Sequence, residues 1–580
     1  MIIKLVVSNM DAHRSLKSNN TLRLPEVVMA PERLGAMHQN RISFVRYFIR
    51  QMAQKKWQVC QHDWQLSPEG YGHAIYRLET QQHQYHLVVF CDEISDEERN
   101  DRVIAEKWDV TFALIQGEVD TSLLERLRAN VPLQEAGRNP NSALVLARAN
   151  KSVRVFEHLV SNLAEGNQPD PQQLANVGYI LRTTAVYGNG KFGIADFKLL
   201  EDNPDFHQSF SAQMCAVYLL REFSLDWIHF LAKQRGGEKA TTLHRSLQRY
   251  LGVGNATGLG MAPYLINHPC IVDQWMTTRE QALGEILDQP FDRAKLPQLD
   301  HLLGQAVIHL NQVVTIDGHQ RLLNKQAKEE LITFRNVIAN LASESPTDWH
   351  SLVQHSQCCG LEAQEIILSC VMELYPDIAD SYQEKMNCDE TLALTSGKKV
   401  KDLMLVLESR YRWAIDTDFQ LPENSYWFWY RSQDKEEPRL GVRGEEAGEE
   451  RELPLDIGRQ VYRLYSALLQ SEPQQTLAEF LVLNPQYRGI AKRAWTLGNK
   501  VMGDIQMNVL HKGSLPMHLL RCKLAVFGAT KFDPRSDRWV QVTFFQGAPL
   551  LDEIHDEEWL FPILPSSQEL SLPGLVGEAK

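Results

Sequence analysis

Residues 210–233, FSAQMCAVYLLREFSLDWIHFLAK, decide the fold class of this chain. Their apolar residues recur every three or four positions, which predicts one long helix. The same spacing dominates from Asn141 to Asp418 and predicts further helices over residues 142–164, 171–187, 241–251, 271–287, 321–341, 361–373 and 399–415. Asp170 followed by Pro171 marks a helix start, and Gly188 and Gly252 stand where two helices would end. The centre of the chain is therefore expected to be helical.

Helical and strand patterns mix on both sides of this central region. Before it, the patterns predict a helix over 41–55, a hairpin of strands 71–79 and 85–91, and a third strand over 108–115. After it, they predict a strand over 426–431, helices over 455–470, 476–483 and 486–510, and a long hairpin of strands 519–527 and 538–545 around a turn at 533–536.

The predicted fold class is α+β, predominantly α-helical, in three parts. Residues 1–140 form a mixed part with an antiparallel hairpin, residues 141–420 a helical domain with glycine-rich loops, and residues 421–580 a mixed part with a long hairpin. One arrangement that fits this symmetry places the N- and C-terminal strands in one sheet, with the helical middle inserted between them.

Charge and composition exclude several classes of protein. The 580 residues carry 60 Lys and Arg against 73 Asp and Glu, a net charge of −13. Such acidity argues against a nucleic-acid partner and against an anionic membrane surface. The N-terminal apolar run is interrupted by Lys4, too short for a signal peptide, and no window suits a transmembrane helix. We expect a cytoplasmic protein; a homo-oligomer is left open.

The nine cysteines support a reducing compartment. They are scattered and contain no CxxC pair, so neither a zinc ribbon nor a thioredoxin-type motif is encoded. The adjacent Cys358 and Cys359 are expected to be small apolar residues at a turn before Gly360.

The most informative motif is the stretch from Arg182 to Gly193, RTTAVYGNGKFG. Its glycines predict a tight turn whose backbone N–H groups can approach an anion. Arg182, expected at a helix end, and Asn189 could bind a carboxylate or phosphate. Lys191 and Tyr187 carry groups that can move protons. The alternative is purely structural, a glycine cap with basic residues at the negative end of the helix dipole.

This motif is not a Walker A loop, which needs a glycine where Ala185 stands and a serine or threonine where Phe192 stands. A second glycine cluster covers residues 252–260, GVGNATGLG, and precedes His268. It is not a dinucleotide fingerprint, because a helix rather than a strand is predicted before it. Asn255 and Thr257 are polar candidates in this cluster, and His268 is a candidate for proton transfer.

We predict that both clusters face one pocket. In this hypothesis Arg182, Asn189, Asn255 and Thr257 bind a small anionic metabolite, and Lys191, Tyr187 and His268 are catalytic. The protein would be a lyase- or hydrolase-type enzyme that uses side-chain proton transfer or elimination and no organic cofactor. The alternative is a non-catalytic interaction or regulatory protein with structural glycine turns.

A third hypothesis is a metal-dependent enzyme. Glu222, Asp226 and His229 are spaced four and three apart, so one helix would present them on one face. A carboxylate and a histidine at this spacing form half of a di-metal site in helix bundles. No second such pair occurs, and His301, His309 and His319 are irregularly spaced. The stripe is therefore expected to be a buried polar network, with a metal as the alternative.

Overall fold

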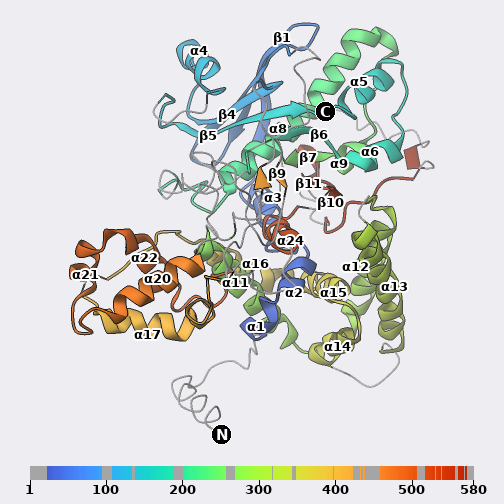
Figure 1. Ribbon diagram of the computed structural model, residues 1–580. Coiled ribbons are helices and arrows are strands. Elements are labelled where there is room, and N and C mark those ends of the chain that lie inside the picture. The colour runs from blue at the N-terminus through green and yellow to red at the C-terminus, as the bar shows by residue number, and fades with distance from the viewer. Residues whose placement is uncertain are drawn as a thin grey trace.

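The structure is a computed structural model (Figure 1). It describes residues 23–94, 107–133, 138–183, 185–186, 200, 202–255, 265, 268–315, 318–341, 348–395, 397–421, 431–432, 436–437, 457–505, 516–529, 531–536, 539–554, 559–566 and 569–570.

Nine of the strands that the structure describes form one sheet at the centre of the fold, in the order β1-β2-β3-β4-β5-β6-β7-β11-β10. Its strands are β1 Gln58–Leu66, β2 Gly72–Glu79, β3 Gln84–Cys91, β4 Val110–Gln116, β5 Ala143–Lys151, β6 Tyr179–Thr183, β7 Gly252–Asn255, β10 Lys531–Ser536 and β11 Trp539–Phe544. Strands from all three predicted parts therefore share one sheet, although the domain boundaries themselves stay predictions. A separate two-stranded ladder joins β8 Arg431–Ser432 to β9 Glu436–Glu437.

One strand pair differs from the others in direction. Strands β6 and β7 are parallel, whereas the other pairs among the described strands of this sheet are antiparallel. A parallel pair needs a crossover connection, and the chain between these strands contains α8 Ser211–Gly236 and α9 Arg245–Tyr250. The helix predicted over 210–233 is thus the crossover helix of a βαβ unit.

The two faces of the sheet pack against different helices. Alternation along β2, β3 and β4 sends Ile75, Val88 and Ala113 to one face, where they join Leu127 of α4 Thr121–Asn130. The opposite face joins the main core, which includes most of α8. Because α8 is apolar on nearly all sides, it can lie inside the molecule rather than on its surface.

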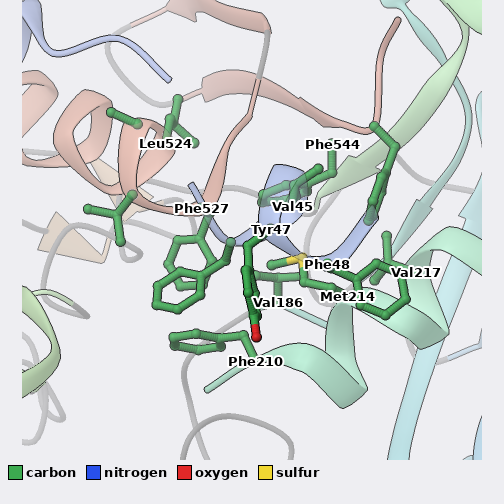
Figure 2. Packing of buried hydrophobic residues seen from close by; sticks show 14 of the residues in the cluster. Val45, Tyr47, Phe48, Val186, Phe210, Met214, Val217, Leu524, Phe527 and Phe544 are labelled. Carbon is green, nitrogen blue, oxygen red and sulfur yellow. The ribbon is translucent and has the colours of Figure 1, made fainter. Parts of the chain in front are cut away.

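Aromatic rings join this core to elements from both ends of the chain (Figure 2). Phe210, just before α8, makes edge-to-face contacts with Phe44 of α3 Phe44–Gln54 at 4.9 Å and with Phe527 of α24 Pro516–Phe527 at 4.6 Å between ring centres. Val186, three residues after the end of β6, is buried in the same cluster. The chain leaving β6 therefore begins in the core.

The remaining helices form two groups below the sheet in Figure 1. One contains α11 Pro269–Leu287, α12 Leu296–Gln312, α13 Gly318–Leu341, α14 Trp349–His355, α15 Leu361–Glu373 and α16 Pro376–Ser381, with α1 Pro25–Val28 and α2 Pro31–Ala36 packed near them. The other contains α17 Val400–Arg410, α18 Arg412–Ile415, α20 Ile457–Leu469, α21 Leu477–Leu483 and α22 Arg488–Leu497. The broad prediction of a largely helical α+β protein is confirmed.

Several predicted elements are wrong. Residues 142–164 form strand β5 followed by α5 Phe156–Ala164, and the helix predicted over 171–187 ends early as α6 Pro171–Val177, followed by β6. Residues 519–527 lie in helix α24 instead of a strand, and the predicted turn at 533–536 belongs to strand β10. Strand β1 was not predicted. The predicted strand 426–430 lies outside the described residues.

In the part of the chain that the structure describes, no helix combines the length and apolar character needed to cross a membrane.

Candidate functional site

The two glycine clusters begin on neighbouring strands. Arg182 pairs with Gly254 and Thr183 pairs with Asn255 across the parallel β6–β7 ladder. Because the strands are parallel, the chain leaves both of them in the same direction and at the same level of the sheet. The start of the Arg182 cluster and the middle of the second cluster therefore lie side by side, although about seventy positions separate them in sequence.

Arg182 is on a strand and not at a helix end, which corrects the prediction. Helix α6 begins at the predicted cap, where the Asp170 side chain accepts a hydrogen bond from the Gln172 N–H. It ends at Gly178, whose φ of 80° is left-handed, so the helix-ending glycine comes ten positions before Gly188. The alternative in which Arg182 lies at the negative end of a helix dipole is therefore excluded, because no helix ends at Arg182.

The glycines of β7 serve close packing. A Cβ on Gly252 would collide with the carbonyl oxygen of Phe544, and a Cβ on Gly254 would come within 2.7 Å of the Tyr179 ring. Neither glycine has a positive φ, so Gly252 is a strand residue and not the helix cap that was predicted. These two glycines let β6 and β11 approach β7.

A buried arginine fixes the entry to β7. Arg221 of α8 donates hydrogen bonds from Nε to the Leu251 carbonyl at 2.8 Å and from Nη1 to the Pro549 carbonyl at 3.0 Å. Its Nη2 donates to the carbonyls of Gln248, Arg249 and Ala548. One charged side chain therefore joins the crossover helix, the end of α9 and the chain after β11.

The exit from β6 is held by a threonine. The Thr183 hydroxyl donates to the Arg148 carbonyl at 2.9 Å and accepts from the Ala185 N–H at 3.1 Å. With Val186 buried as well, the first part of the glycine-rich segment has a fixed path. Tyr187, Asn189 and Lys191 lie outside the described residues, and so does Thr257 of the second cluster.

The described candidates differ in their surroundings. Arg182 is partly buried, whereas Asn255 at the end of β7 is almost wholly buried. His268 is partly buried at the cap position of α11, immediately before Pro269. The register places Arg182 and Asn255 one position apart at the same end of two neighbouring strands, where alternation directs their side chains to opposite faces of the sheet. His268 belongs to the start of the next helix.

The carboxylate and histidine stripe on α8 has separate partners. The Tyr76 hydroxyl donates to Asp226 at 2.5 Å, the His229 Nε2 accepts from the Leu243 N–H at 3.1 Å, and Glu222 lies 3.5 Å from Arg221. Burial raises the pKa of Glu222 to about 7 and lowers the pKa of His229 to about 4. Each of the three side chains therefore has its own polar partner. Among the described residues, no group of three His, Cys, Asp or Glu side chains is arranged to hold a metal.

A cavity of about 90 Å³ lies elsewhere in the molecule. Its lining includes Ala175 of α6 and Tyr250 of α9, which precede β6 and β7. It is therefore close to the amino ends of the parallel pair, opposite to the ends where the glycine clusters continue. None of the predicted site residues lines this cavity.

The charged and titratable groups of this cavity are already compensated. Arg521 donates from Nη2 to Glu362 at 2.8 Å and from Nη1 to the Gln320 amide oxygen at 3.1 Å. His309 donates from Nδ1 to the Pro562 carbonyl at 2.9 Å, and burial lowers the pKa of His38 to about 3. The walls are therefore close to neutral. Sequence reasoning missed this cavity because its lining residues come from many separate stretches between Met37 and Pro562 and share no motif.

Comparisons of the chain with protein-family models, with curated proteins and with solved structures give no match in any of the three. The function has to be inferred from the geometry.

Proposed function

We propose that the carboxyl ends of β6 and β7 bind a small anionic metabolite, a carboxylate or a phosphate, and that the protein is an enzyme acting on it. The observation that supports this is the pairing of Arg182 with Gly254 and of Thr183 with Asn255. Ligands of sheets with parallel strands typically bind beyond the carboxyl ends of those strands, where loops from neighbouring strands meet.

The chemistry follows from the residue types of the two segments. Arg182 offers a planar fork for two-point binding of an oxyanion, and Asn189, Asn255 and Thr257 add neutral polar groups. Lys191, Tyr187 and His268 are the proposed proton carriers for a lyase- or hydrolase-type reaction without an organic cofactor. His268 stands at the start of α11, immediately before Pro269.

A non-catalytic interaction protein is the second candidate. The observation that favours it is the packing role of Gly252 and Gly254, since glycines required for strand contact need no ligand to explain them. The metal-dependent alternative is weakened by the separate partners of Glu222, Asp226 and His229.

The test is a thermal-shift screen of the purified chain against small carboxylates and phosphates. A ligand at 100 times its Kd stabilises the folded state by about 2.7 kcal/mol. Arg182→Ala should weaken binding of the ligand found at least about tenfold, because a charge-assisted hydrogen bond to an anion is lost. Arg154→Ala, at an exposed position beyond β5, is the matched control and should leave binding unchanged.

Lys191→Ala separates binding from chemistry. It should reduce turnover by about 10²–10⁴-fold while the affinity for the ligand changes much less. Full affinity in a folded Arg182→Ala protein would contradict the proposed site. If no compound of the panel raises the unfolding temperature of the wild-type protein, the non-catalytic interaction protein is favoured. If the purified protein contains a stoichiometric transition metal, the metal-dependent enzyme is favoured.

A further inference from the structure

The cavity of about 90 Å³ beside Arg521 lies apart from the proposed anion site, and packed rings form part of its wall. His38 and His309 both line it, and their rings pack against the buried Phe561 at 5.2 and 5.8 Å between ring centres. Two distant segments are thereby held against one aromatic side chain. This part of the wall therefore has a defined shape.

The His38 imidazole keeps one hydrogen-bond acceptor for a ligand. Its Nδ1 donates to the Gln39 carbonyl at 3.1 Å, since a carbonyl oxygen can only accept. Burial lowers the pKa of His38 to about 3, so the ring stays neutral and Nε2 carries a lone pair. Among the described residues, none donates a hydrogen bond to this Nε2.

The next residue adds a second acceptor to the same wall. Gln39 is 2% exposed, and its Nε2 donates to the Leu560 carbonyl, which identifies the other amide atom as the oxygen. This Oε1 is buried and has no hydrogen-bond partner in the described part of the chain. A buried acceptor without a donor is unfavourable, so the wall favours a guest that donates.

The rest of the wall favours an uncharged guest with an apolar part. Arg521 already donates to Glu362 at 2.8 Å and to Gln320 at 3.1 Å, so this ion pair needs no further counter-charge. An ion in the cavity would lose its hydration without gaining a partner of opposite charge. Ile366 and Leu524 supply buried apolar side chains to the same wall.

The volume limits the size of this guest. An engineered cavity of about 150 Å³ takes up benzene, which has six non-hydrogen atoms. By the same measure, a cavity of about 90 Å³ holds about four non-hydrogen atoms.

We propose that this cavity is a binding site for a small uncharged molecule of the class of short-chain alcohols. The hydroxyl group of the ligand donates to His38 Nε2, and its apolar part lies against Ile366 and Leu524. The site is independent of the proposed anion site, because none of the residues assigned to anion binding lines the cavity.

The experiment uses the full chain and three fluorinated compounds of four non-hydrogen atoms each. They are 2-fluoroethanol, 1-fluoropropane and 2-fluoroethylammonium, which differ only in a hydroxyl, a methyl or an ammonium group. Titration with the protein is followed by the fluorine NMR line width of each compound. We expect 2-fluoroethanol to bind with a Kd of about 0.1–10 mM, at least about tenfold tighter than the other two.

Two variants test the geometry of the site. His38→Leu replaces the acceptor with an apolar side chain, so 2-fluoroethanol should then bind no more tightly than 1-fluoropropane. Ala529→Leu places a larger side chain in the wall and should abolish binding of both compounds. His301→Leu is the matched control, because it removes an exposed histidine of α12 that does not line the cavity, and it should leave all three affinities unchanged.

The comparison of the three compounds needs only the wild-type protein, so it stands even if a variant misfolds. Equal affinity for the hydroxyl and methyl compounds, or tighter binding of the ammonium compound, would overturn the proposal. A folded His38→Leu protein that still prefers 2-fluoroethanol over 1-fluoropropane tenfold would do the same.

Discussion

Arg279 of α11 donates a hydrogen bond from Nη2 to Glu365 of α15 at 2.5 Å, and both side chains are completely buried. Arg33 and Arg23 bind the other oxygen of the same carboxylate at 2.6 and 3.0 Å. One carboxylate therefore joins the N-terminal helices to the helical centre. Burial by itself would raise the pKa of Glu365, but Arg23, Arg279 and Arg33 together hold it well below its usual value.

Glu365→Gln should destabilise the protein by about 3–5 kcal/mol, because Arg33 loses its counter-charge and Arg23 and the buried Arg279 are left to share the single carboxylate of Glu280. A carboxyl group with a depressed pKa contributes stability above its unfolded pKa and loses it as the pH falls. The difference between variant and wild type should therefore shrink in acid. Urea unfolding at neutral and acidic pH measures it, with the exposed Glu329→Gln as control. Equal stability of Glu365→Gln and the control at pH 7 would refute the account.

Glu222 should have the opposite pH dependence. Burial raises its pKa to about 7 despite the neighbouring Arg221, so the folded state binds a proton more tightly than the unfolded state does. Wild-type stability should therefore fall as the pH rises from the unfolded pKa of about 4.3 to about 7. Glu222→Gln removes this penalty and should be more stable by up to about 3 kcal/mol at pH 8, with little gain below pH 5.

The measurement is urea unfolding of both proteins across this pH range. Glu125→Gln, on the exposed side of α4, is the matched control and should show no such trend. A Glu222→Gln protein that gains nothing between pH 5 and pH 8 would show that the carboxyl titrates normally.

Gly252→Ala tests the packing of β7 against β11, its antiparallel neighbour. The added methyl group would meet the Phe544 carbonyl oxygen at the end of β11 and the Gln546 backbone nitrogen just after it, so β7 and β11 would have to separate. We expect a loss of about 2–4 kcal/mol in unfolding free energy.

Gly489→Ala is its control, because a methyl group at this position of α22 meets nothing within 4 Å. Alanine favours helix, so this variant should gain about 0.5 kcal/mol. Thermal or chemical unfolding of the two variants measures both the expected loss of stability in Gly252→Ala and the expected gain in Gly489→Ala. A tolerated Gly252→Ala would mean that β7 does not require close contact with β11.

Hydrophobic periodicity predicted an element well where the pattern fitted only a helix or only a strand. The helix over 361–373 has the same bounds in the structure, and the hairpin of β2 and β3 agrees within about one residue at each end. Residues 143–151, ALVLARANK, were misassigned because a stretch rich in alanine and leucine suits a helix as well as a buried strand. Only their neighbours in β4 and β6 select the strand.

The candidate site could likewise be predicted from the sequence only in part. Its residue types and glycines are local features, so Arg182 and Asn255 could be named from the sequence alone. That they lie on adjacent parallel strands depends on a crossover through α8, with Arg221 binding carbonyls more than three hundred positions away. The cavity beside Arg521 has no local signal in the sequence at all.

Neighbouring residues alone were enough to show that the chain is acidic and largely helical, and to locate helices such as that over 361–373, because periodicity and charge are local properties. The tertiary structure alone decided that strands from all three parts share one sheet, and that Arg23, Arg33 and Arg279 meet on Glu365. Such contacts form only when distant segments exclude water together, and no short stretch of sequence contains that information.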